Sequence, residues 1–187
     1  MKKRLMALFV VVSALLAACD VASGPSGREV VVEPGGTVYF NPQTGDVFTR
    51  EDVKLAPQGF SLTLCAFRWN NVHQTSRDGV KEIKGDWTGS CPSSQDSYYL
   101  DPNPSMLKRN AFGVYASVAP KKIVGVRKLV GSSGASWIRT EVFTTVPCVN
   151  GSYKSRIDFV ATNPNGVALS QKLASGVSSA YTISTCG

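Results

Sequence analysis

The chain has 187 residues, a formal net charge of +7 at pH 7, 17 glycines and 10 prolines. Glycine and proline recur too often for long helices, and no window keeps a helical period over three turns. Three of the 20 basic residues precede residue 5, and the remaining positive excess is mild. This excess favours an anionic partner and does not indicate nucleic acid.

The N-terminal residues have the parts of an export signal. A basic start at residues 2–4 precedes an uncharged apolar stretch at residues 5–16, which is shorter than a membrane-spanning helix requires. The stretch ends in Leu16-Ala17-Ala18-Cys19, which resembles the lipobox of bacterial lipoproteins. The resemblance implies cleavage before Cys19, a diacylglyceryl group on its thiol and acylation of the new amino group. We therefore expect residues 1–18 to be a signal peptide and Cys19 to anchor the protein in the inner or outer membrane of the envelope, on the periplasmic side.

The remainder of the chain divides into a tether and a domain. Residues 19–28 are small, polar and interrupted by glycine and proline, which predicts a flexible tether between lipid and domain. Cleavage leaves 187 − 18 = 169 residues, which suits one domain with a sizeable core. From Glu29 onward, short apolar runs separated by turn residues predict an all-β fold. We expect a single antiparallel β-sandwich over residues 29–187.

Turn signals predict two hairpins. The first joins Val30–Val32 to Thr37–Phe40 through Pro34-Gly35-Gly36. The second surrounds Asn150-Gly151, a dipeptide typical of a type I′ turn because both positions require positive φ. Its register gives a mostly apolar face that pairs Cys148 with Tyr153, Val146 with Ser155, Thr144 with Ile157 and Val142 with Phe159. Further strands are expected at residues 60–69, 112–118 and 123–130.

Four cysteines remain besides Cys19, and an even number in an exported chain indicates two disulfides. They are Cys65, Cys91, Cys148 and Cys186. Three connectivities are open, and sequence proximity favours Cys65–Cys91 with Cys148–Cys186. A four-cysteine zinc site is the alternative, but the Cys-x-x-Cys spacing of such sites is absent, so no metal is expected.

A polar stretch at residues 70–110 stands apart from the predicted strands. It contains three prolines, which predicts a long surface loop pinned to the sheet by Cys91. Trp87, Tyr98 and Tyr99 lie in this stretch beside acidic residues, and such rings are favoured anchors of protein contacts. We expect these three residues to bind a partner; the alternative is that they cover the sheet as a local core.

Patterns for catalysis are weak. His73 is the single histidine, and no Gly-x-Ser-x-Gly elbow accompanies it. Ser105-Met106-Leu107-Lys108 is similar to the Ser-x-x-Lys motif of penicillin-binding enzymes, but their Ser-Asp-Asn and Lys-Thr-Gly motifs are missing. No catalytic residue and no cofactor is therefore expected.

These patterns indicate a lipid-anchored β-sandwich with two disulfides that acts as a non-enzymatic binding or assembly module of the envelope. The expected partner is another envelope protein, as for an accessory part of a secretion, conjugation or surface complex. Two alternatives stay open. One is a cell-wall-directed enzyme that uses Ser105, and the other is a sugar-binding or inhibitory lipoprotein that acts through its aromatic residues.

Overall fold

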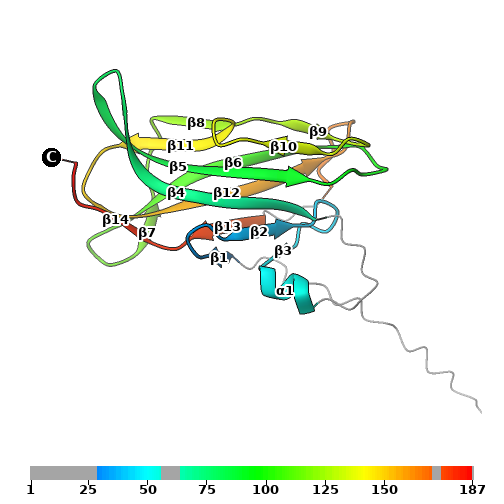
Figure 1. Cartoon of the computed structure of the whole chain (residues 1–187), viewed down its shortest axis with the longest axis horizontal. Helices are drawn as coiled ribbons and strands as arrows, with labels where there is room; N and C mark the ends of the chain where they lie inside the picture. Colours follow the sequence, from blue (N-terminus) through cyan, green and yellow to red (C-terminus); the bar gives the residue numbers. More distant parts are fainter. Residues whose placement is uncertain (1–28, 56–63, 170–173, 187) are drawn as a thin grey trace, which may run out of the picture.

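The protein folds as two β-sheets packed face to face. The computed structural model describes residues 29–55, 64–169 and 174–186. The strands run along the long axis of the molecule, and the short helix α1 (Arg50–Leu55) lies beside β3 (Figure 1). The prediction of an all-β, mainly antiparallel sandwich with two disulfides is confirmed. In the described residues, no helix has the length and hydropathy needed to cross a membrane.

Sheet A is built around the long antiparallel pair β6 and β12. Its seven strands are β1 (Val30–Val32), β6 (Tyr98–Arg109), β7 (Tyr115–Ser117), β9 (Lys128–Val130), β12 (Gly151–Thr162), β13 (Ala174–Ser178) and β14 (Tyr181–Ile183). Their order is β1-β13-β12-β6-β7, with β14 also paired to β12 and β9 also paired to β6. The β1–β13 pair is parallel.

Sheet B is built around the hairpin of β4 and β5. Its seven strands are β2 (Thr37–Phe40), β3 (Val47–Phe48), β4 (Cys65–Arg77), β5 (Val80–Cys91), β8 (Lys122–Gly125), β10 (Ala135–Trp137) and β11 (Val142–Pro147). Their order is β3-β2-β4-β5-β11-β8, with β10 also paired to β5. A β-bulge interrupts the β4–β5 register between Trp69 and Asn71.

Aromatic rings from both sheets fill the space between them. Phe159 of β12 stacks on Phe40 of β2 with 5.0 Å between ring centroids, and it contacts Phe67 of β4 at 4.7 Å. Phe67 in turn packs on Trp137 of β10 at 5.2 Å. The ring of Phe67 occupies the space into which a side chain at Gly89 would project, so this position of β5 requires glycine.

A buried hydrogen bond between Trp87 and Ser155 joins the two sheets. The Nε1–H of Trp87 on β5 donates to Oγ of Ser155 on β12 at 2.9 Å, and both side chains are fully buried. Gly85 leaves room for this pair, because a Cβ there would lie 2.7 Å from Ser155 Oγ. A buried donor left without a partner costs about 1–3 kcal/mol, so this bond favours one position of β5 over β12.

The predicted hairpin at Asn150-Gly151 is wrong. β11 pairs with β5 and β8 in sheet B, whereas β12 pairs with β6, β13 and β14 in sheet A. The chain therefore crosses from one sheet to the other at residues 148–150. The predicted apolar face is nevertheless buried, at residues 142, 144 and 146 of β11 and at 153, 155, 157 and 159 of β12. These residues face the same core from opposite sheets instead of lying side by side in one sheet.

The hairpin predicted at Pro34-Gly35-Gly36 is wrong for the same reason. β1 pairs with β13 in sheet A, and β2 pairs with β3 and β4 in sheet B. A two-residue hairpin is found instead at Asp78-Gly79, between β4 and β5. Both of its residues have the positive φ of a type I′ turn, +52° and +76°.

The cysteine pairing favoured by sequence proximity is confirmed. Cys65–Cys91 joins the neighbouring strands β4 and β5 inside the core. Cys148–Cys186 ties the crossing between β11 and β12 to the segment that follows β14. All four cysteines are therefore bonded in pairs, and the zinc alternative is wrong.

Replacing both Cys148 and Cys186 by serine should lower the free energy of unfolding by about 2–4 kcal/mol, because the unfolded chain regains the freedom that the bridge removes. The bridge spans 38 positions of sequence, and both cysteines are only partly buried, so the serines add no fully buried polar group. Urea unfolding of the native protein and the double variant measures the difference. A loss below about 1 kcal/mol would contradict this account.

Candidate functional site

The surface loop predicted at residues 70–110 is wrong, because most of this stretch forms β4, β5 and β6. Trp87 and Tyr98 point into the core, with exposed fractions of 0 % and 3 %. Burial raises the pKa of the Tyr98 hydroxyl to about 12. Neither ring is available to a partner in this fold, so their assignment as contact residues is corrected to the alternative, a role in the core.

Two prolines explain why this stretch resembles a loop in the sequence. Pro102 and Pro104 lie inside β6, between the part that pairs with β9 and the part that pairs with β7. Over this gap, β6 forms a ladder with β12 alone among the described strands. A residue without an N–H is tolerated where one edge of a strand is unpaired.

Tyr99, the third predicted contact residue, lies on the outer face of sheet A and is half-buried. The guanidinium of Arg127 lies 4.4 Å from the centroid of its ring. Arg127 also donates to Thr162 Oγ1 at 2.8 Å and lies 3.5 Å from Asp101 Oδ2. One face of the Tyr99 ring is thus covered by a side chain of the same protein.

The residues weighed for catalysis are not brought together. Ser105 and Lys108 are three positions apart on β6, so their side chains project from opposite faces of sheet A. His73 lies opposite Lys84 in the β4–β5 ladder, on the outer face of sheet B. Within the described ranges, no three histidine, cysteine or carboxylate side chains lie together as a metal site requires. Cys19, the expected signal peptide and the expected tether lie outside the described residues.

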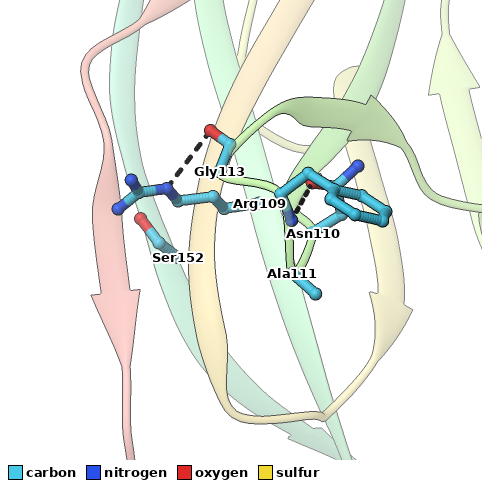
Figure 2. Close-up of a pocket in the computed structure, with 6 residues that line it drawn as sticks. Arg109, Asn110, Ala111, Gly113 and Ser152 are labelled. Atoms are coloured by element: carbon cyan, nitrogen blue, oxygen red, sulfur yellow. Dashed lines mark hydrogen bonds between the residues drawn. The ribbon is translucent and has the colours of Figure 1, made fainter.

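A different feature projects from the end of sheet A, where residues 110–114 connect β6 to β7 (Figure 2). The Oδ1 of Asn110 accepts the backbone N–H groups of Phe112 and Val114, each at 3.0 Å. The carbonyl of Asn110 accepts the N–H of Gly113 at 3.0 Å, and Gly113 has a φ of +82°, which favours glycine. We call this element the Phe112 turn; its own hydrogen bonds hold it in one conformation.

The side chain at the apex of the Phe112 turn is directed into solvent. Phe112 is 91 % exposed, and Val114 beside it is also exposed. The Nε–H of Arg109 donates to the carbonyl of Gly113 at 3.2 Å, and its guanidinium lies near Ser152 (Figure 2). Residues 109–113 and Ser152 line an open hollow of about 460 Å³. The turn therefore presents an exposed apolar ring, and a cation is hydrogen-bonded to its backbone.

The same turn occurs at the opposite end of β12, at residues 163–167. The Oδ1 of Asn163 accepts the N–H of Val167 at 3.0 Å, and its carbonyl accepts the N–H of Gly166 at 2.9 Å. Gly166 has a φ of +81°. We call this element the Asn165 turn, because Asn165 holds the place that Phe112 holds in the first. The turn forms with a polar residue at this position, so its geometry does not require phenylalanine.

The sequence prediction missed the Phe112 turn. A strand was expected over residues 112–118, but β7 covers only Tyr115–Ser117. The signal that identifies the turn is the pattern Asn-x-x-Gly-Val, which occurs at residues 110–114 and again at 163–167. Asparagine caps the turn with its side chain, and glycine supplies the positive φ.

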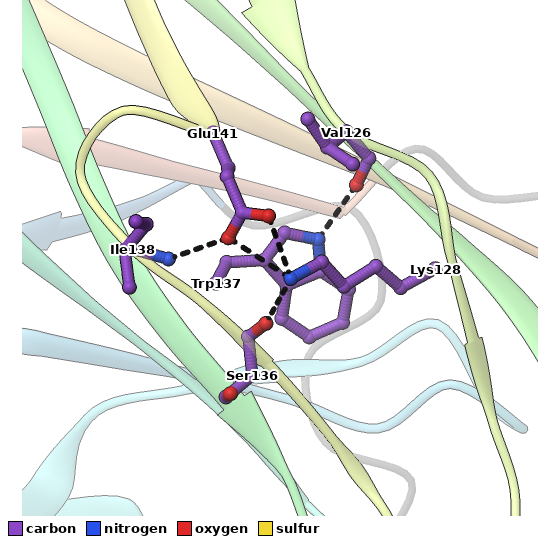
Figure 3. Close-up of polar contacts among 6 residues, drawn as sticks. All are labelled: Val126, Lys128, Ser136, Trp137, Ile138 and Glu141. Carbon is purple, nitrogen blue, oxygen red and sulfur yellow. Dashed lines mark hydrogen bonds and ion pairs between the residues drawn. The ribbon is translucent and has the colours of Figure 1, made fainter.

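Polar contacts around Lys128 link the two sheets near the start of β6, at the end opposite the Phe112 turn (Figure 3). The Nζ of Lys128 lies 2.9 Å from both carboxylate oxygens of Glu141 and donates to the carbonyl of Ser136. Glu141 also accepts the N–H of Ile138 at 2.9 Å. Because the charges and donors are satisfied within the cluster, its role is to join β9 of sheet A to β10 and β11 of sheet B.

The outer face of sheet B carries charges that are paired with each other. Lys84 lies 3.0 Å from Asp86, and Lys121 lies 2.6 Å from Glu82. Lys84 also lies over the ring of Phe143, 4.7 Å from its centroid. Both carboxylates are almost fully buried under these contacts, so Lys84 and Lys121 already have acidic partners.

Acid should destabilise the protein through Glu141. The hydrogen bond and ion pair with Lys128 hold the pKa of Glu141 below its ordinary value of 4.5. A carboxyl group whose folded pKa is lowered contributes its full stabilisation above the unfolded value, and this is lost as pH falls through the lowered one. Urea unfolding should therefore show a decline below about pH 4.5. Glu141→Gln and Lys128→Met should each make that decline shallower, and an unchanged slope in both variants would disprove the assignment.

Trp87→Ala should lower the free energy of unfolding by about 3–5 kcal/mol, because it empties a packed site and leaves Ser155 without its donor. Tyr99→Ala is the matched control and should cost less, about 1–2 kcal/mol, since Tyr99 is only half-buried. Urea unfolding measures both losses. Equal losses in the two variants would contradict the core role of Trp87.

Comparisons with known proteins identify no relative of this chain. No protein-family model matches the chain, and no curated protein or solved structure gives a significant match. The function proposed for the chain therefore depends on the residues and geometry described above.

Proposed function

We propose that the protein is a non-enzymatic binding module of the cell envelope, anchored by the lipid expected on Cys19, that engages another envelope component through the Phe112 turn. The observation that carries the proposal is an almost fully exposed phenylalanine at a turn position that is occupied by asparagine in the second turn of the same kind. A ring in this position contributes no packing to the fold, whereas an aromatic ring buried at a contact is a frequent source of binding energy.

The structure of the turn supports this use. Its backbone is held by Asn110 and Gly113, so a partner meets an ordered surface and little conformational entropy is lost on binding. Arg109 adds a charged donor that is held on the backbone of the same turn. Aromatic residues and arginine are both enriched at the centres of binding surfaces.

The two alternative functions have less support. The serine-enzyme hypothesis needs Ser105 and Lys108 on one face, and they project from opposite faces of β6. The sugar-binding hypothesis was based on Trp87, Tyr98 and Tyr99 as stacking platforms. The first two rings are buried, and one face of the Tyr99 ring is covered by Arg127. A binding module that acts through Phe112 does not depend on any of these residues.

Site-specific photo-crosslinking in the native envelope tests the proposal. A photoreactive phenylalanine analogue at position 112 should give an adduct with an envelope component, protein or lipid, because the side chain lies in the contact. The same analogue at position 165 is the matched control, since it stands at the same place of the same turn at the opposite end of β12. Adducts of equal yield at both positions would refute the proposal.

Phe112→Asn gives the first turn the residue that the second turn carries. It should weaken binding of the component identified at position 112 about 30-fold, equivalent to about 2 kcal/mol, while leaving the melting temperature unchanged. Asn165→Phe should not create binding, because the surroundings of the second turn differ. Unchanged binding by Phe112→Asn would show that the contact lies elsewhere.

A further inference from the structure

Basic residues accompany the Phe112 turn without any acid nearby in the chain. Lys108 and Arg109 end β6 immediately before the turn, and Lys154 lies next to them on β12. The segments that build this end of sheet A, residues 102–121 and 147–157, contain no aspartate or glutamate. This end therefore differs from the outer face of sheet B, where each lysine described above has an acidic partner.

The same imbalance extends through the second half of the chain. From residue 102 to residue 187 the sequence has two acids, Glu141 and Asp158, against ten basic residues. Glu141 is bound to Lys128, and Asp158 is bound to Arg156 at 2.9 Å. Neither acid neutralises the cations beside the Phe112 turn, so this surface is complementary in charge to an anionic partner.

Neighbouring rings hold two of these cations at the end of the sheet. The Nζ of Lys154 lies 4.7 Å from the ring centroid of Tyr115, and the Nζ of Lys108 lies 5.5 Å from that of Tyr153. Arg109 is exposed, and the bond from its Nε to the carbonyl of Gly113 holds it against the turn. Ammonium and guanidinium groups bind phosphate oxygens through charge-assisted hydrogen bonds.

The expected tether is long enough for the anchor and the turn to reach one membrane. β1 begins level with Ile157 of β12, because Val30 pairs with Gly176, which pairs with Ile157. The Phe112 turn lies beside the start of β12, about six residues or roughly 20 Å away along the strand. The ten residues 19–28 span at most about 35 Å when extended.

We infer that the component bound by the Phe112 turn is the surface of an anionic phospholipid bilayer. Phe112 enters the boundary between headgroups and acyl chains, and Lys108, Arg109 and Lys154 contact lipid phosphates. A projecting ring flanked by cations matches such a surface, where aromatic residues favour the interface and each cation is attracted by the negative surface potential. This inference rests on the function proposed above and names the chemistry of its partner.

Fluorescence quenching in vesicles tests the inference. Phe112→Trp is made in the otherwise native protein, whose own Trp69, Trp87 and Trp137 are buried and supply a constant background. The purified protein is mixed with vesicles rich in phosphatidylglycerol or made of phosphatidylcholine alone, both with lipids brominated near the headgroup. The added emission at position 112 should be quenched in the anionic vesicles and much less in the zwitterionic ones. Asn165→Trp is the matched control and should be quenched in neither.

A charge variant separates electrostatic attraction from simple burial of the ring. Arg109→Gln in the Phe112→Trp protein should raise the lipid concentration for half-maximal quenching about fivefold, equivalent to about 1 kcal/mol for one cation. Arg139→Gln removes an exposed cation outside this end and should leave that concentration unchanged. High salt should weaken the quenching, because it screens exposed charges. Melting temperatures of all variants report whether the fold is intact.

The outcomes distinguish the inference from the proposed function. Equal quenching in both kinds of vesicle, or equal quenching at positions 112 and 165, would overturn the anionic-lipid inference. If position 112 is not quenched but its photo-crosslinker captures an envelope protein, the proposed function stands and the partner is a protein. If position 112 gives neither quenching nor a specific adduct, both proposals fail.

Discussion

The sandwich depends on the packing of Phe159 against Phe40 and Phe67 between the two sheets. Gly89 makes this packing possible, because any larger residue there would collide with the ring of Phe67. Apolar burial has no preferred direction, so the rings bring the sheets together without selecting their relative position. The hydrogen bond from Trp87 to Ser155 adds that selection.

The long strand pair β6–β12 extends from the core to both ends of the molecule and supports a turn at each end. At one end β6 continues into the Phe112 turn, and at the other end β12 continues into the Asn165 turn. Two hydrogen bonds are common to both turns: the asparagine Oδ1 accepts the valine N–H, and the asparagine carbonyl accepts the glycine N–H. The turn therefore tolerates either phenylalanine or asparagine at its third position, and the choice changes the surface chemistry. Function can then be carried by a loop residue on a rigid support, which is the usual division in β-sandwiches.

Alternation along the strands was predicted correctly, but pairing was not. The faces expected to be buried on β11 and β12 are buried, yet these strands belong to different sheets. Two strands whose apolar faces meet across a core show the same alternation as two strands that lie opposed in a hairpin. A two-residue hairpin of the type I′ kind was predicted at Asn150-Gly151. The structure has one with positive φ at both residues, but at Asp78-Gly79. Pro102 and Pro104 led to the prediction of a loop where the structure has a strand. They lie at an unpaired stretch along one edge of β6.

The sequence by itself determined the β class of the fold, the faces of β11 and β12 that turn inward and, by proximity, the favoured pairing of the cysteines. These properties are local, because the period of a strand and the distance between two cysteines are carried by a short stretch of chain. Only the tertiary structure decided which strands are neighbours, that Trp87 and Tyr98 are buried, and that Phe112 is exposed. The physical reason is that burial depends on contacts between distant residues. Trp87 and Ser155, which join the two sheets, are 68 positions apart in the chain.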